Sequence, residues 1–316
     1  MSTAIFTPLG GGGHDCGIIF ELTPATKKLK VLHAFCSQDN DGNGPDQALS
    51  YFGKTSGALY DGVSSLVGTT SGGGAQNHGT VFALTPSGGA WTLTTLYGFC
   101  SQANCADGST PSGELMVDAS GNLFGNAIFG GSAGAGVVYE LSPAKKRTPM
   151  MEKVLYFFRT REHCADGQLP IGALAMDAQG QIYGTPEGAN NSEGGAVFKL
   201  TPDGRSWLES VQHVFCGLKC KDGYLPSGGL IVDSSGNVYG VNMLGGTGEG
   251  GVGAGVVYRL NGNELTPLYP FCSEKNCADG SAPLGTLIMD SRGALLGVTS
   301  RGGPNSAAGT VFELKP

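Results

Sequence analysis

Hydrophobic and polar positions recur along this chain in one repeated phrase of six residues. The phrase reads Gly-x-Val-aromatic-x-Leu with conservative changes, and successive copies are 54 to 62 residues apart. The copies begin at Gly17, Gly79, Gly136, Gly195, Gly255 and Gly309. Self-similarity at such a period is the signature of a repeat architecture, so one unit of about 58 residues is used repeatedly.

Each full unit is predicted to form four short β-strands. Apolar and β-branched runs of 4 to 6 residues are bounded by clusters of Gly, Asn, Asp and Pro, a pattern typical of strands joined by tight turns. The sequence Asp-x-x-Gly-Asn at Asp118 and Asp233 indicates such a turn, because glycine supplies the positive φ. No run of helical period and length stands out. The chain is therefore expected to be all-β.

Four-stranded units repeated around an axis form a β-propeller, which leaves only short, protected sheet edges. We expect residues 1–316 to form a single propeller domain with four-stranded blades. The strand runs sum to 22, which fits six blades with one strand missing from each terminal blade. The alternative has five blades, the last closed by the N-terminal strand Val31 to Phe35, with residues 1–25 left as an extra hairpin. Six blades are favoured, because Ile5 to Leu22 carries the ordinary repeat pattern.

Three segments resemble bacterial tandem repeats named for Gloeobacter and Verrucomicrobium, the GloVer repeats. They are Gly68–Gly74, Asn77–Pro86 and Asp118–Gly125. The resemblance extends over nearly the whole chain. It implies a β-propeller and an exported bacterial protein, and it implies no particular activity.

Composition argues against several classes of protein. Glycine makes up 55 of the 316 residues without the triplet period of collagen, and the recurring apolar runs argue against disorder. The net charge of -7, from 19 basic and 26 acidic residues, disfavours a nucleic-acid partner. No apolar run reaches the roughly 18 residues that span a bilayer, so membrane insertion is not expected. We expect a monomer whose partner is a carbohydrate or another cell-surface polymer.

The chain has nine cysteines, whose spacing indicates the redox state of its cellular compartment. Three close pairs stand just before an Asp-Gly dipeptide: Cys100 and Cys105, Cys216 and Cys220, and Cys272 and Cys277. We predict local disulfides, with free thiols and metal binding as alternatives; nearby His partners at zinc spacing are lacking. Disulfides imply an oxidising compartment, either extracellular or periplasmic. Because the N-terminal residues lack the pattern of a signal peptide, we interpret the chain as the mature or trimmed form of an exported protein.

Three cysteines are left over: Cys16, Cys36 and Cys164. In the fourth unit, Arg159 occupies the place of the first cysteine of a pair, which leaves Cys164 alone. Whether Cys16 and Cys36 bond to each other stays open at this point.

A functional site is expected on the face formed by two sets of long loops. In propellers, the loop that enters the innermost strand and the loop between the second and third strands open on the same face. The first set repeats an Asp-Gly dipeptide, and we interpret its aspartates as turn formers or caps: Asp41, Asp107, Asp166, Asp222 and Asp279. Candidate functional residues are instead those that depart from the repeat.

The fourth unit departs most from the repeat. Arg161, Glu162 and His163 stand where other units have a disulfide-bonded loop, and Glu187 lies in the Gly-rich loop of the same blade. These residues are the candidate catalytic residues, because a histidine beside carboxylates can transfer protons. The alternative is a solvated loop of ion pairs. Candidate ligand-binding residues on the same face are His14, Asp15, His78, Asn190, Asn191 and Tyr224.

One loop has the opening pattern of a calcium site. Asp39, Asp41 and Asn43 stand at positions 1, 3 and 5, with glycine at position 6. The closing glutamate is absent, and Asp46 is its candidate substitute. Calcium is therefore a candidate cofactor, and the alternative is an ordinary Asn/Asp-Gly turn.

These observations lead to three functional hypotheses. The first is an exported propeller that binds a carbohydrate or cell-surface polymer on its long-loop face. The second is a hydrolase or lyase acting on a polysaccharide or lactone through the fourth unit, which rests on analogy between folds. The third is a repeat scaffold without a small-molecule site.

Overall fold

The computed structural model describes residues 4–6, 16–23, 25–45, 48–53, 60–143, 150–189, 194–215, 221–246, 253–304 and 308–316. These residues form 23 β-strands and three short 3-10 helices, so the predicted all-β class is confirmed. The chain divides into two compact units, Met1–Phe157 and Phe158–Pro316. Within the described ranges, no helix is long and apolar enough to cross a membrane.

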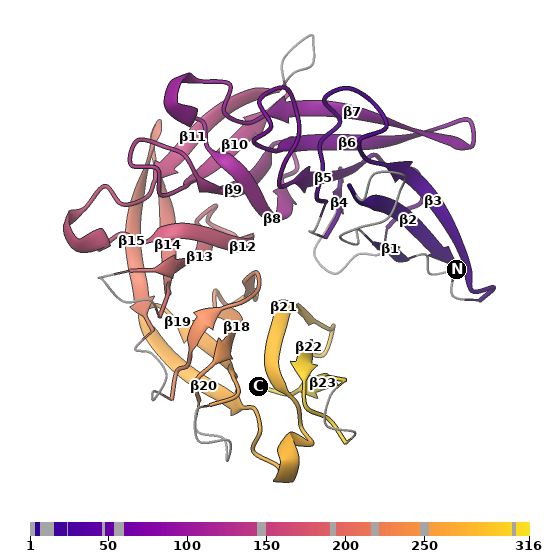
Figure 1. Ribbon diagram of the computed structural model, residues 1–316. Helices are drawn as coiled ribbons and strands as arrows, with labels where there is room; N and C mark the ends of the chain where they lie inside the picture. Colours follow the sequence, from indigo (N-terminus) through magenta and orange to yellow (C-terminus); the bar gives the residue numbers. More distant parts are fainter. Residues whose placement is uncertain are drawn as a thin grey trace. The chain divides into compact units, whose positions relative to one another are not determined.

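The first unit contains three antiparallel sheets, whose strands pair in chain order (Figure 1). The first sheet consists of β1 (Ala4–Phe6), β2 (Ile18–Thr23) and β3 (Lys28–Ala34). The second consists of β4 (Ser50–Tyr51), β5 (Leu66–Thr70), β6 (Thr80–Ser87) and β7 (Ala90–Gly98). The 3-10 helix η1 (Ala103–Cys105) precedes the third sheet, which consists of β8 (Ser109–Val117), β9 (Leu123–Phe129), β10 (Val137–Ser142) and β11 (Met151–Phe157).

The second unit also contains three antiparallel sheets (Figure 1). After η2 (Glu162–Cys164), the first consists of β12 (Gln168–Met176), β13 (Ile182–Gly188), β14 (Ala196–Asp203) and β15 (Ser206–Val214). In the next, β16 (Tyr224–Pro226) and β17 (Ile231–Val232) both pair with β18 (Val238–Leu244), followed by β19 (Val256–Asn261) and β20 (Glu264–Pro270). After η3 (Lys275–Cys277), the last consists of β21 (Ser281–Met289), β22 (Leu295–Arg301) and β23 (Val311–Leu314).

The fold is a β-propeller with four-stranded blades, as the repeat predicts. The count of six blades is not confirmed, because the sheets β1–β3 and β21–β23 have three strands each. Strand β3, which a five-bladed arrangement would place in the last blade, pairs with β2.

A ring of the third strand lies over a glycine of the second strand in five of the sheets. The cross-strand pairs are Gly68 with Phe82, Gly125 with Tyr139, Gly184 with Phe198, Gly240 with Tyr258 and Gly297 with Phe312. A Cβ atom on any of these glycines would approach the ring to under 3.0 Å. The glycine and the aromatic residue of the repeat therefore recur together for one reason: only glycine on the second strand leaves room for the ring of the third strand.

A phenylalanine packs against each of these rings. It directly follows the last strand of a sheet in the sequence, and the ring centroids are 5.0 to 5.4 Å apart. The pairs are Phe35–Phe82, Phe99–Tyr139, Phe158–Phe198, Phe215–Tyr258 and Phe271–Phe312. Such aromatic pairs contribute about 0.5–1.5 kcal/mol each beyond the burial of their surface. Four of the pairs join consecutive sheets of one unit, and the fifth, Phe158–Phe198, lies within the second unit.

The tight turns and disulfides follow the sequence pattern where the structure describes them. Asp118 Oδ1 accepts hydrogen bonds from the backbone N–H groups of Ser120 and Asn122, and Gly121 has a φ of +80°. The predicted Cys100–Cys105 and Cys272–Cys277 disulfides are present, whereas Cys216 and Cys220 lie outside the described residues. Cys16 bonds to Cys36, which the spacing left open, and Cys164 is a free thiol.

We expect Tyr258→Phe to raise the free energy of unfolding by about 1 kcal/mol, because the Tyr258 hydroxyl is buried without a hydrogen-bond partner in the described structure. Gly240→Ala should lower it by about 1–3 kcal/mol, because the added methyl group overlaps the same ring. Urea unfolding of both variants checks the pair. A destabilised Tyr258→Phe protein would contradict this account of the packing.

Candidate functional site

The two long loops of a sheet lie against each other in the described structure. In the second sheet, the backbone N–H of Asn43 donates to the carbonyl of Gly72 at 2.9 Å, and Gly72 returns a bond of 3.1 Å. In the third sheet, the N–H of Gly131 donates to the carbonyl of Cys105 at 2.9 Å. The crossover loop and the loop between the second and third strands thus form one surface on each of these sheets.

The aspartates of the Asp-Gly dipeptides accept hydrogen bonds from the crossover loops and hold them in shape. Asp107 is fully buried, and its Oδ2 accepts hydrogen bonds from Tyr97 Oη at 2.7 Å and from the Ser101 N–H at 2.9 Å. Asp166 accepts the Thr160 N–H at 2.7 Å, and Asp279 accepts the Ser273 N–H at 2.9 Å. The interpretation of these three aspartates as caps is confirmed.

Asp41, the central residue of the predicted calcium loop, makes the same kind of contacts. Its Oδ1 accepts the Cys36 N–H at 3.0 Å, and its Oδ2 lies 3.2 Å from both the Ser37 N–H nitrogen and His33 Nε2. Burial, the largest cause, lowers the pKa of His33 despite its contact with Asp41. Both carboxylate oxygens of Asp41 therefore already accept protein donors.

The other predicted calcium ligands do not complete a described site. Asp39 is exposed and Asn43 half-buried, while Asp46 lies outside the described residues. The donors around Asp41 fit the capping role that Asp107 has, and calcium binding by this loop stays a prediction.

The predicted catalytic residues of the fourth unit are not joined to one another by hydrogen bonds or ion pairs in the described structure. Glu162 and His163 lie exposed on η2, and Glu187 is exposed on β13. Arg161 points to another partner: its Nη2 lies 3.0 Å from both Glu209 Oε2 and the Glu209 carbonyl oxygen. The catalytic role of these residues stays a prediction, whereas the Arg161 contact is with the outer strand β15.

Sequence reasoning missed two carboxyl groups on outer strands, the buried Glu209 and its half-buried counterpart Glu152. They pair across the strands with Leu200 and Leu141, at a position where three other sheets have leucine: Leu29, Leu93 and Leu265. The sequence signal that could have identified these two residues is glutamate at a position where other units of the repeat have leucine.

Burial is the main reason why both glutamates have an altered pKa. It raises the pKa of Glu209 to about 7, with Arg161 opposing and Asp166 adding to the shift. Burial and the charge of Asp107 likewise raise the pKa of Glu152 to about 7, although Gln102 Nε2 donates to its Oε2 at 3.1 Å. Each glutamate thus contacts a residue of the preceding crossover loop.

His78 and Ser109 form the polar pair of the long-loop surface that best fits a ligand site. His78 Nδ1 lies 2.8 Å from Ser109 Oγ, and the imidazole is half-buried while Ser109 is only 6% exposed. The residue at the position of His78 is alanine in three other units and glycine in one. His78 therefore differs from the repeat, and it has Ser109 as a hydrogen-bond partner.

The disulfide Cys100–Cys105 lies beside this histidine. A ring nitrogen of His78 and the two sulfur atoms lie within 4.8 Å of one another. Because the sulfurs are bonded to each other, they are not thiolate ligands for a metal ion. The disulfide instead forms a rigid apolar wall next to the imidazole.

The remaining candidate ligand-binding residues are not gathered at this pair by described contacts. Tyr224 packs against the core cluster around Phe215 and Tyr258. His14, Asp15, Asn190 and Asn191 lie outside the described residues.

The fold defines a repeat β-propeller protein. The family model of the Gloeobacter/Verrucomicrobia repeat matches residues 6–252 and 151–316, so the chain belongs to this repeat family. No curated protein matches the sequence significantly.

Solved structures share the fold at low sequence identity. A gluconolactonase of Xanthomonas campestris is 12% identical with a TM-score of 0.51, covering 99% of this chain and 82% of its own. A candidate 6-phosphogluconolactonase from Bacteroides uniformis is 13% identical with a TM-score of 0.53, covering 98% and 81%. A chain of the nidogen/laminin complex is 14% identical with a TM-score of 0.52, covering 95% and 86%. At these identities the likeness shows the fold alone.

The raised pKa values predict how stability changes with pH. In the folded protein Glu152 and Glu209 hold protons up to a pKa of about 7, above the ordinary value of 4.5. The stabilisation that comes from this shift is complete below the unfolded pKa and is lost as pH rises through 7. With allowance for screening by solvent, the loss in the free energy of unfolding is about 2 kcal/mol per carboxyl group. Urea unfolding at about pH 5 and about pH 8 should show this fall, and Glu152→Gln should reduce it. A fall in the free energy of unfolding that is as large in Glu152→Gln as in the unaltered protein would contradict the raised pKa of Glu152.

Arg161→Ala is expected to lower the free energy of unfolding by about 1–2 kcal/mol, because it leaves Glu209 buried without its cation while Arg161 itself is half exposed. Arg159→Ala, an exposed arginine of the same loop, is the matched control. In a Glu209→Leu background the Arg161→Ala effect should shrink, because only the hydrogen bond to the backbone carbonyl of residue 209 is then left to lose. If Arg161→Ala lowers the free energy of unfolding equally in both backgrounds, the Glu209 carboxylate is not the group through which Arg161 stabilises the protein.

Proposed function

We propose that the protein is an exported β-propeller that binds carbohydrate on its long-loop face, at His78 and Ser109. The observation that carries this proposal is the 2.8 Å contact between His78 Nδ1 and Ser109 Oγ. Most polar side chains of this surface that recur from unit to unit are used by the fold, as Asp107 is. His78 is instead a departure from the repeat, and it is half-buried at the surface, in contact with the buried Ser109.

The chemistry of the pair suits the hydroxyl groups of a sugar. With Nδ1 engaged by Ser109, the imidazole keeps Nε2 for a ligand, as a donor or an acceptor according to its tautomer. Ser109 fixes the ring, and the neighbouring disulfide supplies an apolar contact surface. A few placed polar groups beside apolar walls are the usual composition of a small-molecule site.

The comparison proteins give this proposal limited support from fold analogy. A gluconolactonase and a candidate 6-phosphogluconolactonase, both named for sugar lactones, share the fold. The disulfides of the described residues support an extracellular or periplasmic location.

A second candidate function is hydrolysis of a sugar lactone at the same pair. The favouring observation is again the contact of His78 with Ser109, because a fixed imidazole can accept a proton from the attacking water. Turnover of gluconolactone, followed by acid release, separates this activity from binding alone.

His78→Ala is expected to weaken sugar binding about ten-fold, because one ligand hydrogen bond is lost. Isothermal titration calorimetry with glucose, gluconolactone and neutral gluco-oligosaccharides measures the change. Thr92→Ala, an exposed residue of β7, is the control and should bind as the unaltered protein does. Absence of binding by the unaltered protein to every probe, or equal binding by His78→Ala, would overturn the proposal.

A further inference from the structure

Three side chains with metal-binding atoms meet on the long-loop surface of the first unit. His78 lies just before β6, and Cys100 and Cys105 lie in the crossover loop between β7 and β8. One ring nitrogen of His78 and the two sulfur atoms lie within 4.8 Å of one another. Two atoms that each bind one zinc ion at about 2.0–2.3 Å are at most about 4.6 Å apart, so small side-chain movements bring all three onto one ion.

The first sheet shows that the positions of His78 and Cys100 are in direct contact. Cys16 precedes the repeat glycine as His78 does, and Cys36 follows the phenylalanine after the last strand as Cys100 does. Cys16 and Cys36 are joined by a disulfide, and their Cα atoms are 6.0 Å apart. His78 therefore stands where another unit has a sulfur atom bonded to the loop.

Hydrogen bonds hold the loop of the two cysteines in shape in addition to the disulfide. The Cys100 N–H donates to the carbonyl of Gly108 at 3.1 Å, and the carbonyl of Cys105 accepts the N–H groups of Gly108 and Gly131, each at 2.9 Å. The Asp107 carboxylate caps the same loop. Both cysteines are half-buried rather than enclosed, so a reductant has access to them. The loop is expected to keep its shape when the disulfide opens, with both thiols beside the imidazole.

Residues of the next sheet hold the histidine in place. Ser109 Oγ lies 2.8 Å from His78 Nδ1, and the Thr110 N–H donates to the backbone carbonyl of His78 at 2.8 Å. A histidine that binds a metal ion with one ring nitrogen commonly donates the N–H of the other to such an oxygen, which orients the ring. The imidazole is thus oriented by the protein before an ion binds.

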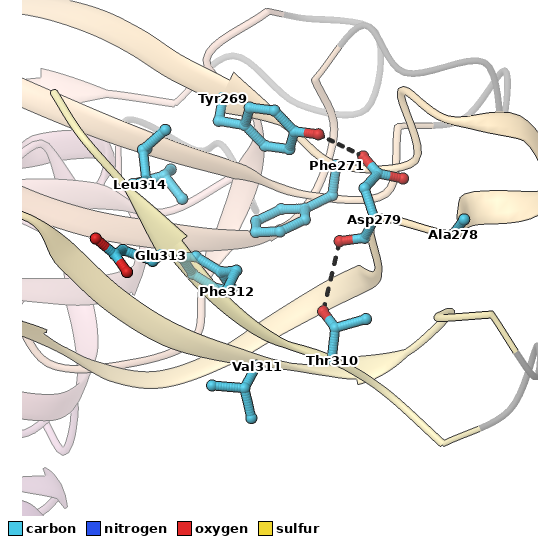
Figure 2. A pocket seen from close by; sticks show the side chains of 10 residues that line it. Tyr269, Phe271, Ala278, Asp279, Thr310, Val311, Phe312, Glu313 and Leu314 are labelled. Carbon is cyan, nitrogen blue, oxygen red and sulfur yellow. Dashed lines mark hydrogen bonds between the residues drawn. The ribbon is translucent and has the colours of Figure 1, made fainter.

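The last crossover loop has the same structure. Residues 271–280 match residues 99–108 at all but two positions. Figure 2 shows Asp279 of this loop accepting a hydrogen bond from Tyr269 Oη, at 2.9 Å, the same capping contact that Asp107 makes in the earlier loop. The two loops therefore have the same local fold.

The last loop differs in lacking the histidine. Ala254 stands at the position of His78, whereas Ser281 keeps the serine of position 109. The Cys272–Cys277 disulfide consequently has two sulfur atoms and no imidazole from this position. The chain thus contains two matched loops, one with the third ligand and one without it.

We infer that the protein binds Zn²⁺ through His78, Cys100 and Cys105 when the disulfide between the two cysteines is reduced. A dithiol reductant supplies two electrons and two protons: it becomes a disulfide itself and leaves two thiols on the protein. Zn²⁺ then displaces one proton from each thiol and binds the two thiolates and the imidazole, and water takes the fourth position. The disulfide and the zinc site are alternative states of one loop. Sugar binding is proposed for the disulfide-bonded protein, so neither proposal depends on the other.

Zinc binding to the reduced, intact protein tests the site. A phosphine is the reductant, because it competes for Zn²⁺ less than a dithiol does, and circular dichroism measures whether the protein stays folded. Competition with a chromogenic chelator should give a Kd for Zn²⁺ below about 1 µM, and the disulfide-bonded protein should not compete. Loss of the fold on reduction, or no competition by the reduced protein, would overturn the inference.

Alkylation by iodoacetamide with peptide mapping locates the ion. Zn²⁺ should slow the alkylation of Cys100 and Cys105 by at least about ten-fold, because the bound thiolates are no longer free nucleophiles. Alkylation of Cys272 and Cys277 in the same sample is the control and should change little. Equal protection of the two pairs would contradict the role of the histidine.

Two substitutions exchange the third ligand between the loops. His78→Ala should weaken zinc binding about 100-fold. Ala254→His should add a second zinc equivalent and extend the protection to Cys272 and Cys277, because Ser281 is present to orient the new imidazole. Unchanged affinity in His78→Ala, or a folded Ala254→His protein that binds no additional zinc, would overturn the assignment of the histidine as a ligand.

Discussion

The packing of an aromatic ring on a glycine sets the geometry of the sheets. The ring of Tyr139 extends across Gly125, and Phe99 from the preceding sheet meets its other side with centroids 5.0 Å apart. A side chain on the glycine would displace the ring, and the phenylalanine would then lose its contact. Because each ring contacts its own sheet and the one before it, the same interaction fixes both the sheet and its neighbour within a unit.

This constraint leaves little freedom to residues that occur in every unit. Asp107, for example, is fully buried and accepts several hydrogen bonds from its own loop. Side chains that contact a ligand are therefore expected at positions where one unit differs from the others. A polar side chain at such a position in a packed structure needs a hydrogen-bond or ion-pair partner. Glu209 has Arg161 and His78 has Ser109, and in both pairs the partner belongs to a neighbouring loop or strand.

Most of the fold could be predicted from the sequence, because its determinants are local. Strand runs, turn glycines and the Asp-Gly caps lie within one unit, and so do the cysteines of Cys100–Cys105 and Cys272–Cys277. The site pairs could not be predicted in the same way. Arg161 and Glu209 are 48 residues apart, and His78 and Ser109 are 31 apart, so their contacts depend on how consecutive sheets pack. The number of blades depends on the terminal sheets, where the repeat is incomplete.

The fourth unit illustrates why a departure in a loop is not evidence of catalysis by itself. Arg161 and Gln102 both stand five residues before the capping aspartate of their loops, and each contacts a glutamate on the outer strand of the next sheet. Where that outer position is leucine, no polar partner is required. In these two loops the residue at this position is therefore matched to the strand that follows, and the contact with Glu209 explains Arg161 without reference to a substrate.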